Sequence, residues 1–177
     1  MRLKFYSVRC LTPWLLLLAA CAHGKPTRSE STEPLELVTD VALPGGATRF
    51  DYQDVDSVHR QLVVAHMNDN AVEILDLQDG SLRGRVTGIA TPRGVVVAPD
   101  INRIFVTSKP GEVVIIDSTS LKEIRRVKTG TAPDGAAWDP VEKIVAVSDQ
   151  HDGALAQLIG RHRNPRRAVA QRLQLLG

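Results

Sequence analysis

Two short acidic segments have residue types and spacings that could bind a metal ion. Residues 149–153 (DQHDG) place carboxylates and the imidazole of His151 close together, and Asp51, Asp54 and Asp56 form the second segment. The first segment lacks the spaced acids and the closing Glu of an EF-hand loop. Asp and Gly are also frequent in turns for conformational reasons. The turn interpretation is therefore favoured for both segments, and neither a metal nor a cofactor is expected.

The common catalytic motifs are absent from the sequence. It contains no GxSxG elbow, no HExxH, no GxxxxGK[ST] loop and no GxGxxG after a strand. These absences favour a binding or scaffold role without catalysis.

The N-terminus has the pattern of an export signal. Arg2, Lys4 and Arg9 precede a mostly apolar stretch, residues 11–20. That stretch is too short to cross a bilayer core of roughly 30 Å as a helix. We therefore predict a signal peptide over residues 1–20.

The end of this segment predicts a lipid anchor. Residues 18–21 (LAAC) resemble a bacterial lipobox, in which the signal is cut before a cysteine that then carries lipid. The prediction is lipid attachment at Cys21, and the alternative is an ordinary signal peptide with an alanine-rich cleavage site. Ala22 follows, and in bacterial lipoproteins the lack of Asp at that position implies export to the outer membrane. Residues 21–34 are polar and contain Pro, Ser and Thr, so we expect a flexible tether to the membrane.

The rest of the chain repeats with a period of about forty residues. Leu62, Ile104 and Ile144 are corresponding positions, 40 to 42 residues apart. Each full unit contains four short runs rich in Val and Ile, separated by turns, which predicts four antiparallel strands. A repeat of this length with four strands is typical of a β-propeller blade. We therefore predict an all-β fold of about two and a half blades over residues 35–160.

Several motifs of these units resemble the YVTN-repeat β-propellers. They are residues 116–120 (IDSTS), 129–135 (TGTAPDG), 138–140 (WDP) and 144–149 (IVAVSD). Those relatives are secreted or surface proteins, so the resemblance implies a binding or scaffold module at the cell envelope. Related propellers include lactonases and quinone- or haem-dependent oxidoreductase subunits. The alternative is therefore a remnant of a propeller enzyme.

The segments on either side of the repeats depart from the pattern. Residues 35–43 resemble an outermost strand without its own blade, of the kind that completes the last blade of a closed propeller. Closed propellers have four to eight blades, so this sequence is not expected to close alone. Residues 161–177 contain five Arg and no acid, and we interpret them as an aberrant basic tail left by a frameshift or an early stop. The alternative is a short helix with Val169, Leu173 and Leu176 on its apolar face.

The predicted blades locate a candidate ligand site. The innermost strand of each blade lines the central channel, so the loop before that strand and the neighbouring loop on the same face are where a ligand would bind. The candidate residues are Arg49, His66, Arg93, Lys109, Asp134 and His151. We expect them to hold an unidentified protein or small-molecule ligand. The other histidines, including His59, are assigned no role, and Trp138 is expected to lie in the core.

The charge distribution disfavours a nucleic-acid partner. The chain of 177 residues has a net charge of +2. The predicted signal contributes +3 and the basic tail +5, so residues 21–160 have a net charge of −6. An acidic domain lacks the basic surface that binds phosphate backbones.

Overall fold

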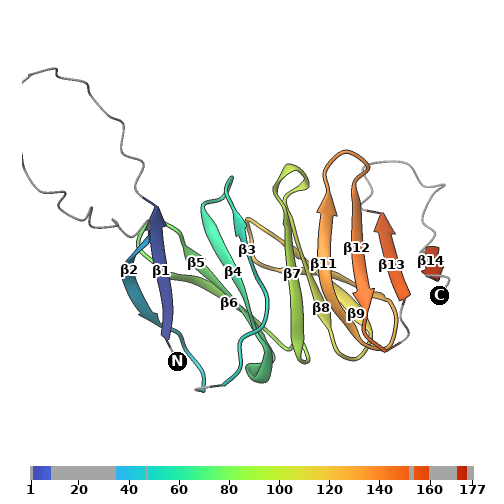
Figure 1. The fold of residues 1–177 in the computed structure, drawn as a ribbon, viewed down its shortest axis with the longest axis horizontal. Helices are drawn as coiled ribbons and strands as arrows, with labels where there is room; N and C mark the ends of the chain where they lie inside the picture. Colours follow the sequence, from blue (N-terminus) through green and yellow to red (C-terminus); the bar gives the residue numbers. More distant parts are fainter. Residues whose placement is uncertain (1, 9–34, 47, 152–153, 160–170, 175–177) are drawn as a thin grey trace, which may run out of the picture. The chain divides into compact units, whose positions relative to one another are not determined.

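The computed structural model describes residues 2–8, 35–46, 48–151, 154–159 and 171–174 (Figure 1). These residues form β-strands and two short 3-10 turns, and no α-helix is present among them. The predicted all-β fold class is confirmed. Within the same residues, no helix is long and apolar enough to span a membrane. The chain divides into two compact units, residues 2–42 and residues 43–177, which are described separately.

The smaller unit is a pair of antiparallel strands. β1 (Arg2–Val8) pairs with β2 (Leu35–Ala42), and Arg2 lies opposite Ala42. The strand expected near residues 35–43 is therefore present, but its partner is β1 rather than the last strand of a blade. Residues 9–34, which contain the predicted cleavage site and Cys21, lie outside the described residues.

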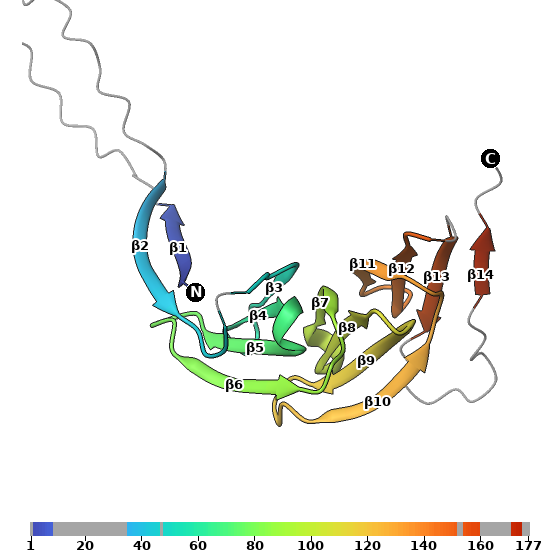
Figure 2. The same cartoon turned by 90° about the horizontal axis from the view of Figure 1, so that it is seen from below.

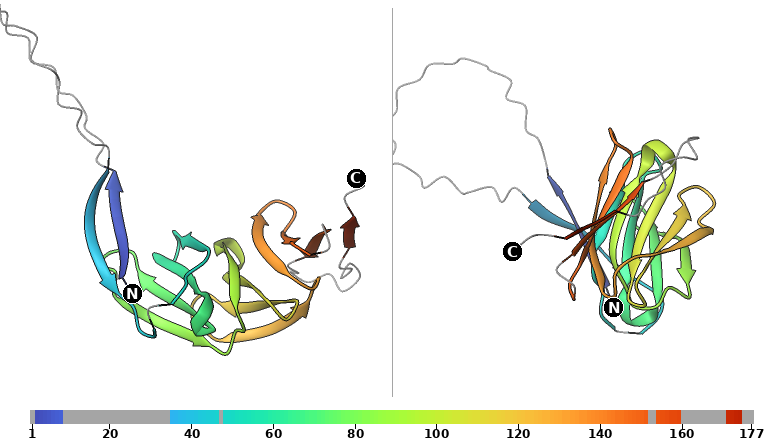
Figure 3. Two further views of the ribbon diagram at one scale, coloured as in Figure 1. Left: turned by 60° about the horizontal axis from the view of Figure 1, so that its bottom comes forward. Right: turned by 90° about the vertical axis from the view of Figure 1, so that its right-hand side faces the viewer.

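The larger unit contains three four-stranded antiparallel sheets. The strands of each sheet are neighbours in chain order. The order can be followed in Figures 2 and 3. The first sheet contains β3 (Gln53–Asp56), β4 (Gln61–His66), β5 (Ala71–Asp76) and β6 (Leu82–Thr87). The second contains β7 (Pro92–Ala98), β8 (Arg103–Ser108), β9 (Glu112–Asp117) and β10 (Glu123–Lys128). The third contains β11 (Pro133–Asp139), β12 (Ile144–Asp149), β13 (Ala154–Ile159) and β14 (Gln171–Gln174). The 3-10 turns are η1 (Met67–Asp69) and η2 (Pro99–Ile101).

The third sheet is more complete than the repeat pattern predicts. Its fourth strand, β14, comes from the basic tail and pairs with β13, so the sheet has four strands rather than the two or three that the repeat supplies. The helix alternative is wrong for Gln171–Gln174. An outer strand such as β13 offers unpaired backbone groups, which any extended segment can satisfy. Residues 160–170 and 175–177 of the predicted tail lie outside the described residues.

Apolar side chains between the sheets form the core. Val63 and Ile74 of the first sheet belong to one buried cluster with Ile104 and Ile116 of the second. This explains why β4 and β8 are apolar on both faces, since a sheet between two neighbours has no solvent face.

A second cluster joins the second and third sheets. It includes Phe105, Val113, Val145 and Val147. Trp138, which was expected to lie in the core, is partly buried and packs against the edge of this cluster, with its ring 5.9 Å from that of Phe105.

One backbone hydrogen bond recurs in each of the three four-stranded sheets. The segment that leads into the first strand accepts an N–H from the turn after the second strand. The three bonds run from Asn68 N to Arg49 O, from Lys109 N to Ala90 O, and from Gln150 N to Ala132 O, at 3.4, 3.2 and 3.0 Å. The repeat is therefore visible in the backbone as well as in the sequence. These bonds hold the candidate ligand loops together at one end of each sheet.

We predict that Gly94→Ala destabilises the fold. A Cβ atom at Gly94 would lie 2.1 Å from the backbone oxygen of Asp134 in the next sheet, and backbone cannot move aside cheaply. The expected loss is about 1–3 kcal/mol of unfolding free energy, measured by urea denaturation. Gly135→Ala, at the equivalent repeat position, is the control because its Cβ would meet only side-chain atoms, the Ser148 hydroxyl at 3.3 Å and the Tyr52 hydroxyl at 4.0 Å. Equal losses in the two variants would contradict the prediction.

Candidate functional site

The six predicted ligand residues lie at the same end of their sheets. Arg49 precedes β3, while Arg93 and Asp134 are the second residues of β7 and β11, the innermost strands of their sheets. His66 ends β4, and Lys109 and His151 follow β8 and β12. Their side chains nevertheless have very different surroundings.

Arg93 and Asp134 come together in a hydrogen-bonded cluster with Gln150. Arg93 Nη1 lies 3.3 Å from Asp134 Oδ1 and donates to Gln150 Oε1 at 2.7 Å. Gln150 Nε2 donates to the other carboxylate oxygen, Asp134 Oδ2, at 2.8 Å. The side chains of Arg93 and Asp134 are 18% and 15% exposed. Two neighbouring sheets thus build one polar cluster, which solvent reaches at its edge.

The backbone around this cluster is fixed by hydrogen bonds between sheets. Tyr52 N donates to Arg93 O at 3.3 Å, which joins the first sheet to the second. Thr107 Oγ1 donates to Asp134 O at 2.6 Å and accepts from Gly94 N at 2.7 Å. The cluster is therefore part of a rigid framework, which is what a binding site requires.

His66 is buried rather than presented to a ligand. Its relative exposure is 0%. Nε2 lies 2.8 Å from Thr48 Oγ1, Nδ1 lies 3.1 Å from Glu73 Oε1, and the ring of Phe50 is 4.3 Å away. The expectation of a loop histidine does not hold, because His66 is the last residue of β4 and packs beneath the segment that precedes β3.

Asp69 and Arg85 close this buried set into a ring. Arg85 Nε lies 3.0 Å from Glu73 Oε1, and Arg85 Nη2 donates to Asp69 Oδ2 at 2.9 Å. Thr48 Oγ1 donates to Asp69 Oδ1 at 2.8 Å. The hydrogen bonds from Thr48 and Arg85 outweigh desolvation and hold the pKa of Asp69 below its ordinary value. This ring fastens the segment around Thr48 to the first sheet.

The other three predicted residues are exposed. The side chain of Arg49 is 64% exposed, and its Nη2 lies 3.9 Å from Asp51 Oδ2. Lys109 and His151 are exposed, and their backbone N–H groups donate to Ala90 O and to Asp149 Oδ1. Arg49, Lys109 and His151 lie at the same end of their sheets as the cluster of Arg93, Asp134 and Gln150.

The acidic segments make hydrogen bonds typical of turns. Asp56 Oδ1 accepts the backbone N–H groups of Val58 and His59, at 3.1 and 2.9 Å. Asp149 Oδ1 likewise accepts the N–H of His151 at 3.0 Å, while its Oδ2 accepts the N–H of Ala132, in the segment before β11, at 2.9 Å. In the part of the chain that the structure describes, no three His, Cys, Asp or Glu side chains form a group that could hold a metal ion. Residues 152 and 153 lie outside that part.

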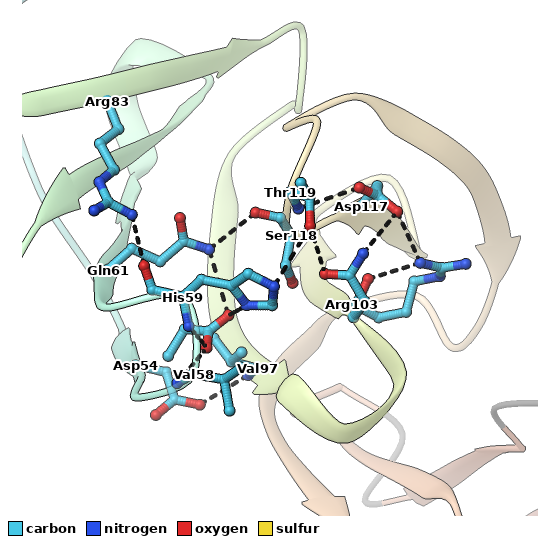
Figure 4. Close-up of polar contacts among 12 residues, drawn as sticks. Asp54, Val58, His59, Gln61, Arg83, Val97, Arg103, Asp117, Ser118 and Thr119 are labelled. Carbon is cyan, nitrogen blue, oxygen red and sulfur yellow. Dashed lines mark hydrogen bonds and ion pairs between the residues drawn. The ribbon is translucent and has the colours of Figure 1, made fainter.

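A second polar cluster joins the first and second sheets at the end opposite the ligand loops (Figure 4). His59 Nδ1 lies 2.7 Å from Asp56 Oδ2, and Nε2 lies 3.4 Å from Thr119 Oγ1 in the second sheet. Gln61 Nε2 donates to Ser118 O at 3.1 Å. Asp56 is fully buried. The sequence assigned His59 no role because it lies in a turn, and its partner Thr119 is sixty residues away in the chain.

A third contact completes this junction. Asp54 Oδ2 accepts the backbone N–H of Val97 at 2.8 Å, so an acid of the first sheet binds the inner strand of the second. Asp54 Oδ1 accepts the N–H of Val55 at 2.8 Å, so both carboxylate oxygens bond backbone.

We predict that His59→Ala loosens this junction. The change leaves the buried carboxylate of Asp56 without its imidazole partner, which should cost about 1–3 kcal/mol of unfolding free energy. The control is His151→Ala, an exposed position where a change within about 0.5 kcal/mol is expected. Urea denaturation of both variants provides the measurement. A His59 variant as stable as the parent would show that the contact does not stabilise the fold.

Comparisons with known proteins support the propeller architecture. No protein-family model matches the chain, and the search of curated proteins found no match. Among solved structures, hydrazine synthase from Kuenenia stuttgartiensis is similar over 60% of this chain, with a TM-score of 0.57 and 20% identity. A chain of the mitotic checkpoint complex is similar over 71%, with a TM-score of 0.60 and 18% identity. The dihydro-heme d1 dehydrogenase NirN, in complex with DHE, is similar over 66%, with a TM-score of 0.51 and 24% identity.

These neighbours are propeller-type proteins, and at such identities the likeness shows the fold alone. The chain covers 31%, 39% and 24% of their respective lengths.

Proposed function

We propose that this β-propeller chain is a binding module of the bacterial cell envelope, of the YVTN type and anchored by lipid at Cys21. The observation that supports a binding role is the cluster of Arg93, Asp134 and Gln150. It is built from the innermost strands and turns of two sheets, and it is partly exposed. Polar groups held by a rigid framework at strand ends are a common basis of recognition. The ligand is a small molecule or a protein segment.

The anchor part of the proposal predicts the behaviour of Cys21→Ser. A serine cannot form the thioether, so the variant should incorporate no labelled fatty acid and should leave the membrane fraction of an expressing bacterium. Cys10→Ser is the matched control, because Cys10 lies in the segment that we expect to be removed. Metabolic labelling and cell fractionation measure both properties. Label retained in the Cys21 variant, or lost in the Cys10 variant, would exclude this anchor.

The binding part predicts where small ligands contact the protein. The processed chain, labelled with nitrogen-15, is titrated with sets of small anionic, neutral and cationic molecules and followed by NMR. At least one molecule should shift the resonances of Arg93, Asp134 and Gln150, and Arg93→Gln should weaken its binding by about tenfold or more. Arg60→Gln, in the turn between β3 and β4 at the other end of the first sheet, should bind as the parent does. Shifts confined to other parts of the protein would rule out this face as the site.

A further inference from the structure

We propose that His66 is a proton-dependent switch: while both of its ring nitrogens carry a proton, it holds residues 48–50 against the first sheet. These residues lead into β3 and include Arg49. The inference goes beyond the proposed binding function and does not depend on it. It follows from counting the protons that the contacts around the imidazole require.

Three contacts in a row connect two acids through His66. Glu73 Oε1 lies 3.1 Å from His66 Nδ1, and His66 Nε2 lies 2.8 Å from Thr48 Oγ1. Thr48 Oγ1 lies 2.8 Å from Asp69 Oδ1. Each contact needs one hydrogen between its two atoms, and an ionised carboxylate supplies none. The threonine hydroxyl supplies one and a neutral imidazole supplies one, so a third proton is required.

Arg85 indicates where the third proton resides. The charged groups around the imidazole in the described residues are Asp69 of η1, Glu73 of β5 and Arg85 of β6. Arg85 Nε lies 3.0 Å from Glu73 Oε1, and Arg85 Nη2 donates to Asp69 Oδ2 at 2.9 Å. A guanidinium beside two carboxylates favours their ionised forms. The third proton therefore belongs to His66, and two cations then balance two anions, as buried charges require.

Burial makes the charge of His66 important for the fold. His66 and Glu73 are 0% exposed, and the ring of Phe50 lies 4.3 Å from the imidazole. Glu73 Oε2 has no hydrogen-bond partner among the described residues, within which the carboxylate's hydrogen bond comes from His66 Nδ1. If His66 loses its second proton, one of the three contacts becomes a pair of acceptors with no hydrogen between them. Such a pair is costly in a buried site.

The contact with Thr48 connects this charge to the ligand face. The hydroxyl of Thr48 and the bond from Asn68 N to Arg49 O, at 3.4 Å, hold the segment to the first sheet. Loss of the proton weakens the hold at Thr48. Arg49, whose side chain is 64% exposed, is the next residue. The charge of His66 therefore determines whether the backbone of Arg49 is fixed at this end of the sheet.

Two measurements on the full chain, labelled with nitrogen-15, test the switch. NMR of the imidazole nitrogens counts the protons on His66 from about pH 5 to about pH 9, where an imidazole can change its charge. Hydrogen exchange, corrected for the intrinsic rate at each pH, gives the protection of the backbone N–H groups of residues 48–50. This protection should fall about tenfold or more as His66 loses its second proton. The N–H of Val106, in the second sheet, should keep its protection.

A variant separates the switch from a simple structural contact. Thr48→Val keeps the shape of the side chain but removes the hydroxyl. The protection of residues 48–50 at low pH should then fall to the level of the parent at high pH, and its pH dependence should disappear. Thr87→Val, an exposed threonine of the same sheet, is the control and should behave as the parent does. Thermal melting of both variants verifies folding.

Three results would overturn the inference. One is a His66 ring with a single proton while residues 48–50 stay protected, which would assign the third proton to an acid. Another is a protection in the parent that does not change when His66 changes its charge. The last is a Thr48 variant that retains the pH dependence of the parent.

Discussion

The apolar packing between successive sheets is the constraint on which the rest of the structure depends. The second sheet shows it most clearly, because Ile104 and Ile116 belong to the cluster shared with the first sheet, while Phe105 and Val113 belong to the cluster shared with the third. No sheet could bury its side chains alone. The apolar side chains in the middle of each strand are therefore buried between sheets. Polar side chains that form clusters lie at the strand ends. Those ends are where recognition can occur.

Two polar clusters use the strand ends in different ways. The cluster of Asp56, His59 and Thr119 joins the first and second sheets around a fully buried carboxylate. The cluster of Arg93 and Asp134 joins the second and third sheets and stays open to solvent. Buried polar groups require well-placed hydrogen-bond partners, so the cluster of Asp56, His59 and Thr119 specifies how the first and second sheets meet. The cluster of Arg93 and Asp134 is positioned by the same packing of the sheets, but its edge is accessible to solvent.

The sequence predicted the sheets well and the individual contacts less well. The period of about forty and the Val- and Ile-rich runs predicted four strands in each full unit. The repeat placed Arg93 and Asp134 in the loops before the inner strands, whereas the structure makes them the second residues of β7 and β11. The burial of His66 could not be predicted, because it depends on Thr48 and Glu73, which no spacing rule connects to it. The strand β14 was missed because its segment lacks the repeat pattern, and pairing of backbone groups needs no particular side chains.

The division of one polar cluster between two sheets has a thermodynamic consequence. Arg93 belongs to the second sheet, and Asp134 and Gln150 to the third, so the cluster exists only while these sheets are docked. Anything that binds the assembled cluster but not its separated halves shifts the equilibrium toward docking by mass action. Ligand binding therefore stabilises the docking of the two sheets, and docking of the sheets in turn raises the affinity for the ligand.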